Sequence, residues 1–241
     1  MYHSVIILPA GDTAVSVELG DIISAEVNFR VRNLMASIER SKIAGVVDLV
    51  PSYRSLLIYY DPLVIPYAEL VSNIRSCEVS LSESRLIPKI VEIPTVYGGG
   101  YGPDLDYVAT SNGITTDEVI LLHSSNDYLI YMMGFRPGFT YLGGMSEKIA
   151  TPRLQTPRLV IPAGSVGIAE QQTGIYPIES PGGWQIIGRT PINIFDPERD
   201  PPVIADAGDY VRFVPVSEKE YLETKSLVEE RIYRLVTLPF I

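Results

Sequence analysis

The sequence GFRPGFTYLGG occupies residues 134–144, and TPRLQTPR (151–158) and PAGSVGIAEQQTGIYPIESPGGWQIIGR (162–189) follow it. Residues 134–189 contain ten of the nineteen glycines in the chain. Glycine reaches positive φ and lets backbone or a ligand approach closely, while the prolines of this stretch fix φ and remove donors. Short apolar runs lie between these residues, which is typical of a small antiparallel barrel or sandwich.

Charge also distinguishes this stretch from the rest of the chain. The whole protein carries a formal net charge of −10, whereas residues 134–189 have more cations than anions. The cations are Arg136, Lys148, Arg153, Arg158 and Arg189, and the anions are Glu147, Glu170 and Glu179. A cationic, glycine-rich stretch in an acidic protein predicts a binding site for a small anion.

Composition limits the class of protein. The 241 residues suit one large domain or two small ones, and no run of apolar residues is long enough to span a membrane. The N-terminus lacks the features of a signal peptide, and the single cysteine, Cys77, suits a reducing cytosol, so we expect a cytoplasmic protein. The negative net charge argues against binding to nucleic acid. Two histidines and one cysteine argue against a zinc site, and we expect no metal site in this chain.

The first part of the chain alternates strand and helix patterns. Polar and apolar residues alternate over Thr13–Leu19 as in a strand, and apolar residues then recur at helical spacing to Ile38, with Asp21 or Ser24 available as the cap. The later predicted elements are strands at Val46–Val50 and Ser55–Tyr60, a helix from Pro66 and a strand at Leu86–Ile93. This β-α-β-β-α-β order predicts a ferredoxin-like α/β domain over residues 1–88.

We expect the β-barrel domain in the second part of the chain, residues 89–241. Gly113 is expected to stop a short helix that starts at Pro103, and Thr115 with Glu118 forms a capping box for the next helix. Short β-like runs follow from Tyr128, and Ser217 with Glu220 predicts the cap of a final helix. The expected fold class is therefore α+β, with two domains joined without a spacer.

Several motifs make this chain similar to a known family. They are GDTAVSVELG (11–20), PSYRSLLIYYDP (51–62), YGPDLDYVA (101–109), the three segments quoted above and GDYVRFVP (208–215). In this order they resemble the KipI-type proteins, also called allophanate hydrolase subunit 1, a family that includes the B component of 5-oxoprolinase. The resemblance covers almost the whole chain and implies a cyclophilin-like barrel after the α/β domain. Glu170 departs from the family pattern, in which glycine is more frequent at this position.

The resemblance also implies partners and cofactors. Such proteins work with a KipA-type subunit (the C component of 5-oxoprolinase), and the oxoprolinase adds a LamB/YcsF-type subunit (the A component). The complex uses ATP and Mg²⁺ to open the lactam of 5-oxoproline and release glutamate. This chain has no GxSxG nucleophile elbow and no GxxxxGK[ST] phosphate loop, so we expect it to be inactive alone.

Candidate substrate-binding residues lie in the glycine-rich stretch. Arg153, Arg158 and Arg189 have the planar fork that binds a carboxylate or phosphate, although ordinary ion pairing is an equally open interpretation. The amides and hydroxyl of Gln171, Gln172 and Thr173 suit a lactam or carboxylate, and turn hydrogen bonding is the alternative.

Candidate catalytic residues are few. Glu179, beside two glycines and the single tryptophan, can serve as a base, and a solvated turn residue is the alternative. His123 ends the apolar run VILLH; its alternatives are a general base or a helix-terminal histidine with satisfied hydrogen bonds.

A third set of residues predicts a groove or a surface that contacts a partner. Its aromatic members also suit core packing, above all Phe135 and Trp184. The set is Gly134, Phe135, Pro137, Gly138, Phe139, Tyr141, Tyr176 and Trp184.

Three functions remain open from the sequence. The first is the B component of an ATP-dependent 5-oxoprolinase. The second is a KipI-like regulator that inhibits a sensor histidine kinase through its cyclophilin-like domain. The third, prolyl isomerisation by the barrel, ranks lowest because a shared fold does not carry function.

Overall fold

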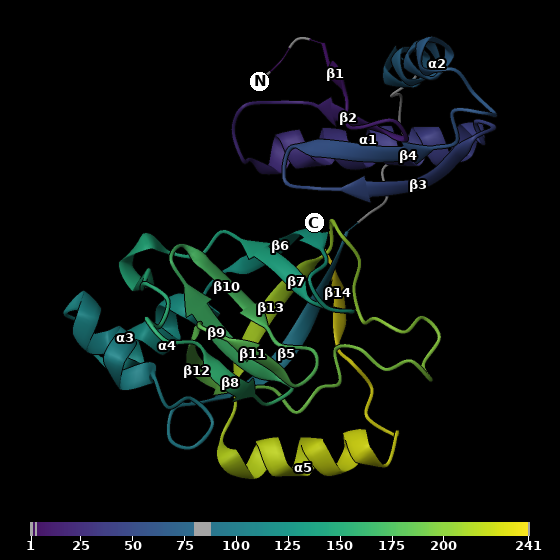
Figure 1. The fold of residues 1–241 in the computed structure, drawn as a ribbon. Helices are drawn as coiled ribbons and strands as arrows, with labels where there is room; N and C mark the ends of the chain where they lie inside the picture. The colour runs from purple at the N-terminus through teal and green to yellow at the C-terminus, as the bar shows by residue number, and fades with distance from the viewer. Residues whose placement is uncertain (1, 3, 80–87, 241) are drawn as a thin grey trace. The chain divides into compact units, whose positions relative to one another are not determined.

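The computed structural model describes residues 2, 4–79 and 88–240 (Figure 1). The chain forms two compact units, Met1–Leu86 and Ile87–Ile241, and each is described by itself. The predicted domain boundary at residues 88 and 89 lies beside residues 80–87, which are outside the described residues, and it stays a prediction.

The first unit is a four-stranded antiparallel sheet packed against two helices. The strand order is β1-β2-β4-β3, and one face of the sheet shares a hydrophobic core with both helices. The elements are β1 (Ile6–Pro9), β2 (Ala14–Glu18), α1 (Ala25–Ser41), β3 (Val46–Pro51), β4 (Ser55–Tyr60) and α2 (Tyr67–Val79).

Local sequence explains these elements. Val15 and Val17 are buried while Ser16 between them is half-buried, which is the alternation predicted for β2. The Ser24 side chain accepts a hydrogen bond from the Val27 N–H at 3.2 Å and so caps α1. Of the two predicted caps, Ser24 is therefore confirmed.

The ferredoxin-like order is not confirmed. The described order is β-β-α-β-β-α, because Ile6–Pro9 forms a strand that the sequence pattern did not predict. The strand predicted at Leu86–Ile93 belongs, from Lys89 onward, to the sheet of the second unit. Its residues 86 and 87 lie outside the described residues. This strand is β5 (Lys89–Tyr97), which continues past the predicted end at Ile93 and pairs with strands of the barrel.

The second unit contains a closed seven-stranded barrel, so the predicted barrel is confirmed, but it is not fully antiparallel because Tyr210–Pro215 pairs in parallel with β5. Its likeness to cyclophilin stays a prediction. Neighbouring strands follow the order β12-β9-β10-β7-β6-β13-β5, and β5 pairs with β12 to close the ring. These strands are β5 (Lys89–Tyr97), β6 (Asp127–Met133), β7 (Thr140–Gly143), β9 (Ser165–Ala169), β10 (Gln172–Ile175), β12 (Gln185–Arg189) and β13 (Tyr210–Pro215). The glycine-rich stretch therefore supplies four of the seven barrel strands.

The remaining elements surround the barrel (Figure 1). A two-stranded sheet pairs β8 with β11, and β14 pairs with the start of β5. Of the predicted closing strand at Ile232–Phe240, only β14 forms. These elements are α3 (Leu105–Asn112), α4 (Thr116–Ser124), the short 3₁₀ helix Glu147–Ile149, β8 (Arg158–Ile161), β11 (Ser180–Gly182), α5 (Glu218–Glu229) and β14 (Thr237–Pro239).

Capping confirms three predicted helix ends. Gly113 ends α3 in the left-handed conformation, with φ of 68°. Thr115 with Glu118, and Ser217 with Glu220, form complete capping boxes at the starts of α4 and α5.

Candidate functional site

His123 lies at the end of α4 inside the barrel core and is fully buried. Its Nε2 is 2.7 Å from Thr173 Oγ1, its Nδ1 is 2.8 Å from the Tyr97 hydroxyl, and Thr173 Oγ1 donates to the Gly167 carbonyl at 3.0 Å. The single hydroxyl proton of Thr173 is used on Gly167, so Thr173 accepts from His123 Nε2–H. Nδ1 then accepts from Tyr97. The network joins β5, α4, β10 and β9.

Burial sets the protonation state of this network. It lowers the pKa of His123 from 6.5 to about 3 and raises the pKa of Tyr97 well above 10.0. The imidazole is therefore neutral at neutral pH, and both ring nitrogens have partners. In this geometry His123 and Thr173 face the barrel interior and each other, so no ring nitrogen is left to take a proton from a substrate.

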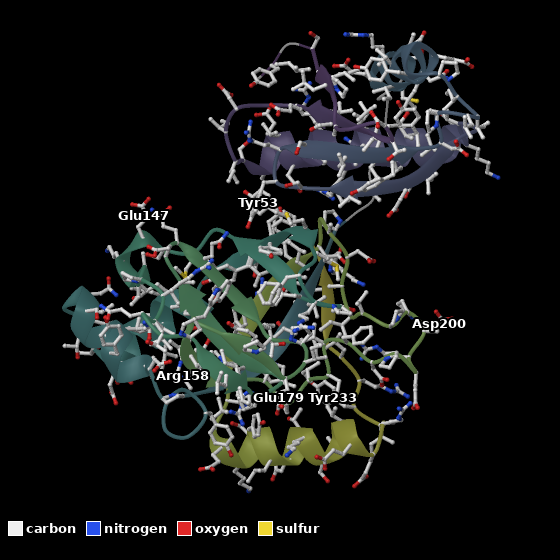
Figure 2. The ribbon with its side chains drawn as sticks, in the orientation of Figure 1. Tyr53, Glu147, Arg158, Glu179, Asp200 and Tyr233 are labelled. Atoms are coloured by element: carbon white, nitrogen blue, oxygen red, sulfur yellow. The ribbon has the colours of Figure 1, made fainter. Side chains whose placement is uncertain are left out.

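Arg158 lies at the start of β8 (Figure 2), and its guanidinium is bound to a carboxylate. Its Nη2 lies 2.7 Å from Asp104 Oδ1, and Asp104 Oδ2 accepts from the Ile186 N–H at 2.6 Å. Asp104 is buried at the start of α3. The pair therefore ties β8, α3 and β12 together. Sequence analysis missed Asp104, because no local pattern connects residues 54 positions apart.

Arg189, the last residue of β12, has a different environment. It is half-buried, its guanidinium lies 5.8 Å from the centre of the Tyr101 ring, and its Nε is buried without a hydrogen-bond partner among the described residues. Ser165 lies opposite Arg189 on β9, and its buried Oγ also lacks a partner in the described part of the chain. Two arginines that look alike in the sequence therefore differ in their pairing.

Arg153 is exposed and lies near the phenol of Tyr176. Burial raises the pKa of Tyr176, while a hydrogen bond with the Trp184 backbone and the positive charges of Arg153 and Arg158 oppose that rise. The structure thus brings two of the predicted arginines to one phenol and leaves Arg189 apart from them.

The predicted polar residues of the β9–β10 turn differ in exposure. Gln171 is exposed, and Gln172 is half-buried at the start of β10. Glu170 has φ of 52°, a conformation that favours glycine. This backbone requirement gives a physical reason for the glycine of the family pattern. Glu179 is exposed just before β11, and no described neighbour holds its carboxylate.

An aromatic cluster covers part of the barrel wall. Phe139 is buried and makes edge contacts with Tyr141, Tyr176 and Trp184, with ring centres 5.2, 5.9 and 5.7 Å away. Phe135 contacts Phe139 at 5.7 Å but is 64% exposed. Core packing thus accounts for Trp184 and not for Phe135.

The loop that carries Phe135 is tightly turned. Phe135 and Gly138 have φ of 65° and 78°. Gly138 is buried, and a Cβ there would lie 2.8 Å from the Phe195 Cβ. Gly134 is half-buried and Pro137 is exposed. This backbone presents the Phe135 side chain to solvent.

A cleft of about 420 Å³ lies elsewhere in the second unit, and none of the predicted site residues lines it. Lys89, Arg199 and Arg231 are its cations. Arg199 donates to four backbone carbonyls, and Lys89 and Arg231 have carboxylate neighbours. These cations are therefore already paired.

Metal donors do not cluster in residues 2, 4–79 and 88–240, which contain no group of three or more His, Cys, Asp or Glu side chains able to hold an ion. None of the described helices is both long and apolar enough to cross a membrane.

Comparisons with known proteins give a consistent result. The profile of the family "Carboxyltransferase domain, subdomain C and D" matches residues 5–205. The B subunit of the 5-oxoprolinase of Bacillus subtilis (strain 168) is 45% identical over an alignment of 223 residues, and the match covers 88% of this chain and 92% of that protein.

Two further relatives differ in length. The crystal structure of a conserved uncharacterized protein of Pyrococcus horikoshii is 53% identical, with a TM-score of 0.55, and the match covers 90% of this chain and 100% of that chain. The urea amidolyase of Saccharomyces cerevisiae is 25% identical over 94% of this chain but only 14% of its own length. The same unit therefore occurs both as a separate chain and within a much longer one.

Proposed function

Because this chain belongs to the carboxyltransferase domain family, subdomains C and D, together with proteins named as the B subunit of 5-oxoprolinase, we propose that it is the B subunit of a 5-oxoprolinase. In this proposal the complete complex uses ATP to open the lactam of 5-oxoproline to glutamate. The observation that carries the proposal is the 45% identity to the Bacillus subtilis protein, which extends over 92% of that protein.

The geometry supports a subunit rather than a complete enzyme. His123 is fully buried and hydrogen-bonded at both nitrogens, and the exposed Glu179 has no described partner to position it. A nucleophile needs an adjacent base to be activated. Thr173 beside His123 is a hydroxyl next to a base, but both side chains are fully buried and the Thr173 hydroxyl donates to the Gly167 carbonyl.

We propose that ATP and Mg²⁺ act at the level of the complex. The described residues contain no group of three metal-ligating side chains, and the sequence has no phosphate-binding loop. Arg158, a predicted phosphate ligand, is bound to Asp104. We therefore assign the nucleotide and its metal to a partner subunit.

The expected partners are the KipA-type subunit and the LamB/YcsF-type subunit. The urea amidolyase relative supports a macromolecular partner, because its matching unit is part of a much longer chain. The exposed Phe135, with Pro137 beside it, is our proposed contact surface, since large exposed aromatics mark interaction sites. A cytoplasmic location stays a prediction.

Within the complex, we assign substrate contacts to the barrel wall. Arg189 and the exposed Arg153 are our proposed cationic contacts, and the amides of Gln171, just before β10, and Gln172, its first residue, are our proposed contacts to the lactam. Glu179 remains a proposed base that a partner subunit would have to position.

Reconstitution tests the proposal. We would co-express this chain with the candidate partners and measure glutamate release from 5-oxoproline and ATP, omitting each subunit in turn. We expect turnover from the full set and none from this chain alone. Robust turnover by the isolated chain would refute the assignment as a subunit, and no turnover by the full set would refute the assignment as an oxoprolinase.

A parallel assay separates the regulatory alternative. Autophosphorylation of a candidate sensor histidine kinase would be measured with and without this chain. Inhibition of the kinase, together with no turnover by the assembled subunits, would favour the regulator.

A further inference from the structure

The guanidinium of Arg189 is not neutralised by any described acidic residue. Arg158 and Arg212, two other half-buried arginines of the second unit, each have a carboxylate at 2.7 Å. Arg189 has the Tyr101 ring as its described contact, and its Nε is shut off from water without an acceptor. A buried polar group without a partner destabilises the fold, so such an arrangement calls for an explanation.

Ser165 adds a second unpartnered group beside Arg189. The two residues lie directly opposite each other on β9 and β12. The Ser165 backbone bonds to Pro162 and Tyr176 rather than to Arg189, and side chains of such non-hydrogen-bonded pairs lie close together on one face. Val166, the next residue, belongs to the barrel core, so Ser165 and Arg189 face outward.

Tyr101 fixes one face of the guanidinium. Its hydroxyl donates to Glu218 Oε1 at 3.1 Å, and its ring lies 4.8 Å from that of Tyr221 on α5. The ring is thereby held over Arg189 at 5.8 Å. A guanidinium covered on its face keeps the N–H groups of its edge available, and this planar edge matches a carboxylate.

We propose that Arg189, Ser165 and Tyr101 form a carboxylate-binding subsite on the outer wall of the barrel. This inference rests on the proposed function, because it assigns the carboxylate of 5-oxoproline to this site. Arg189 supplies two parallel N–H donors to the two carboxylate oxygens. Ser165 and Tyr101 are positioning residues: Ser165 Oγ accepts from Arg189 Nε–H once the fork is engaged, and Tyr101 holds the plane of the guanidinium.

Charge supports a selective site. The chain carries a net charge of −10, which repels anions at long range, and exposed charges are screened beyond about 8–10 Å at ordinary salt. A bound anion therefore needs a local cation that no acidic side chain has already neutralised. Arg189 meets this condition and Arg158 does not.

Paired probes test the subsite on the full chain. L-5-oxoproline and its neutral amide share the lactam and differ at the carboxylate, and ligand-observed NMR measures weak binding of each. We expect the wild-type chain to prefer the carboxylate, and Arg189→Ala to weaken 5-oxoproline binding by about tenfold or more. Arg189→Lys should recover part of the loss, and Ser165→Ala should weaken binding by about threefold.

Arg136→Ala is the matched control, because Arg136 is an exposed arginine of the same stretch that also lies over an aromatic ring, at 5.6 Å from Phe135. The Arg136→Ala variant should bind 5-oxoproline as the wild type does. Circular dichroism establishes that each variant is folded, and Arg189→Lys keeps the test valid if the alanine variant is not. Equal binding of acid and amide, no binding of either, or wild-type binding by both folded Arg189 variants would overturn the proposal.

These outcomes are distinguishable from failure of the proposed function. If the assembled complex turns over 5-oxoproline and the Arg189 variants do so normally, the subsite is wrong and the function stands. If the complex is inactive but the isolated chain still prefers the carboxylate through Arg189, the subsite stands and the function fails.

Discussion

The His123 network inside the barrel and the Arg189 region on its outer wall differ in how their polar groups are paired. Inside, His123, Tyr97 and Thr173 form a network in which both ring nitrogens have partners. Outside, Arg189 Nε and Ser165 Oγ face each other from neighbouring strands without partners among the described residues. A satisfied network stabilises a fold, whereas an arginine without a carboxylate partner can still bind an anion. Pairing therefore separates structural residues from candidate binding residues where residue type does not.

The largest expected effect comes from breaking the interior network. His123→Ala leaves a cavity and removes the partner of Tyr97 and Thr173, so the free energy of unfolding should fall by about 3 kcal/mol or more. Urea denaturation measures it. Leu121→Ala is the control on the same helix, where the side chain is 66% exposed, and it should change stability by less than about 0.5 kcal/mol. A loss below about 1 kcal/mol for His123→Ala would remove the distinction between interior and wall.

The same network predicts a pH dependence. The pKa of His123 is lowered from 6.5 to about 3, so the unfolded chain binds a proton that the folded chain excludes. Stability is fully present above pH 6.5 and falls as the pH drops toward 3. Between pH 7 and pH 5, protonation of His123 in the unfolded chain should lower the free energy of unfolding by about 2 kcal/mol. The His123→Gln variant should lose less of its free energy of unfolding over that interval. An equal loss in the wild type and the variant would contradict a buried histidine that is neutral in the folded chain.

The two arginines sharpen the comparison. Arg158→Ala breaks the pair with Asp104 and should lower the free energy of unfolding by about 1 kcal/mol, since the arginine side chain is 32% exposed and partly screened. Its affinity for 5-oxoproline should stay within about twofold. Arg189→Ala should show the reverse pattern, with a small change in the free energy of unfolding and a large loss of affinity for 5-oxoproline. Parallel denaturation and binding curves measure both, and a shared pattern would mean that pairing does not assign their roles.

The smallest expected effect on stability concerns Phe135. Phe135→Ser should change the free energy of unfolding by less than about 0.5 kcal/mol, because the ring is 64% exposed. Its affinity for the KipA-type subunit should fall by about fivefold. Leu222→Ser, at an exposed residue of α5, is the control and should leave association unchanged. If both variants associate normally, the loop at Phe135 is not the contact surface.

Much of the fold could be predicted from the sequence, because its signals are local. The alternation over Ala14–Glu18 and the capping boxes at Thr115 and Ser217 depend on neighbouring residues. Glycine spacing also indicated the short barrel strands. The order of the first sheet was not predictable in this way: β5 pairs with β12, β13 and β14, and such long-range pairing leaves no mark in a short window.

The candidate site shows the same limit. The sequence identified Arg158, Arg189 and His123 as chemically capable, but their pairing depends on Asp104, Ser165 and Tyr97 from distant segments. Burial then reverses what residue type suggests for His123, whose pKa is far from 6.5. Residue type thus indicates what a side chain can do, and its neighbours decide whether it remains free to do it.

The most direct measurement is ATP-dependent glutamate release from 5-oxoproline by the assembled subunits, comparing wild-type chain with Arg189→Ala and with Arg40→Ala, a change at an exposed arginine in the last turn of α1. We predict that the complex is active, that Arg189→Ala lowers kcat/KM by about tenfold or more, and that Arg40→Ala leaves it unchanged. An inactive wild-type complex, or full activity with Arg189→Ala, would contradict the account.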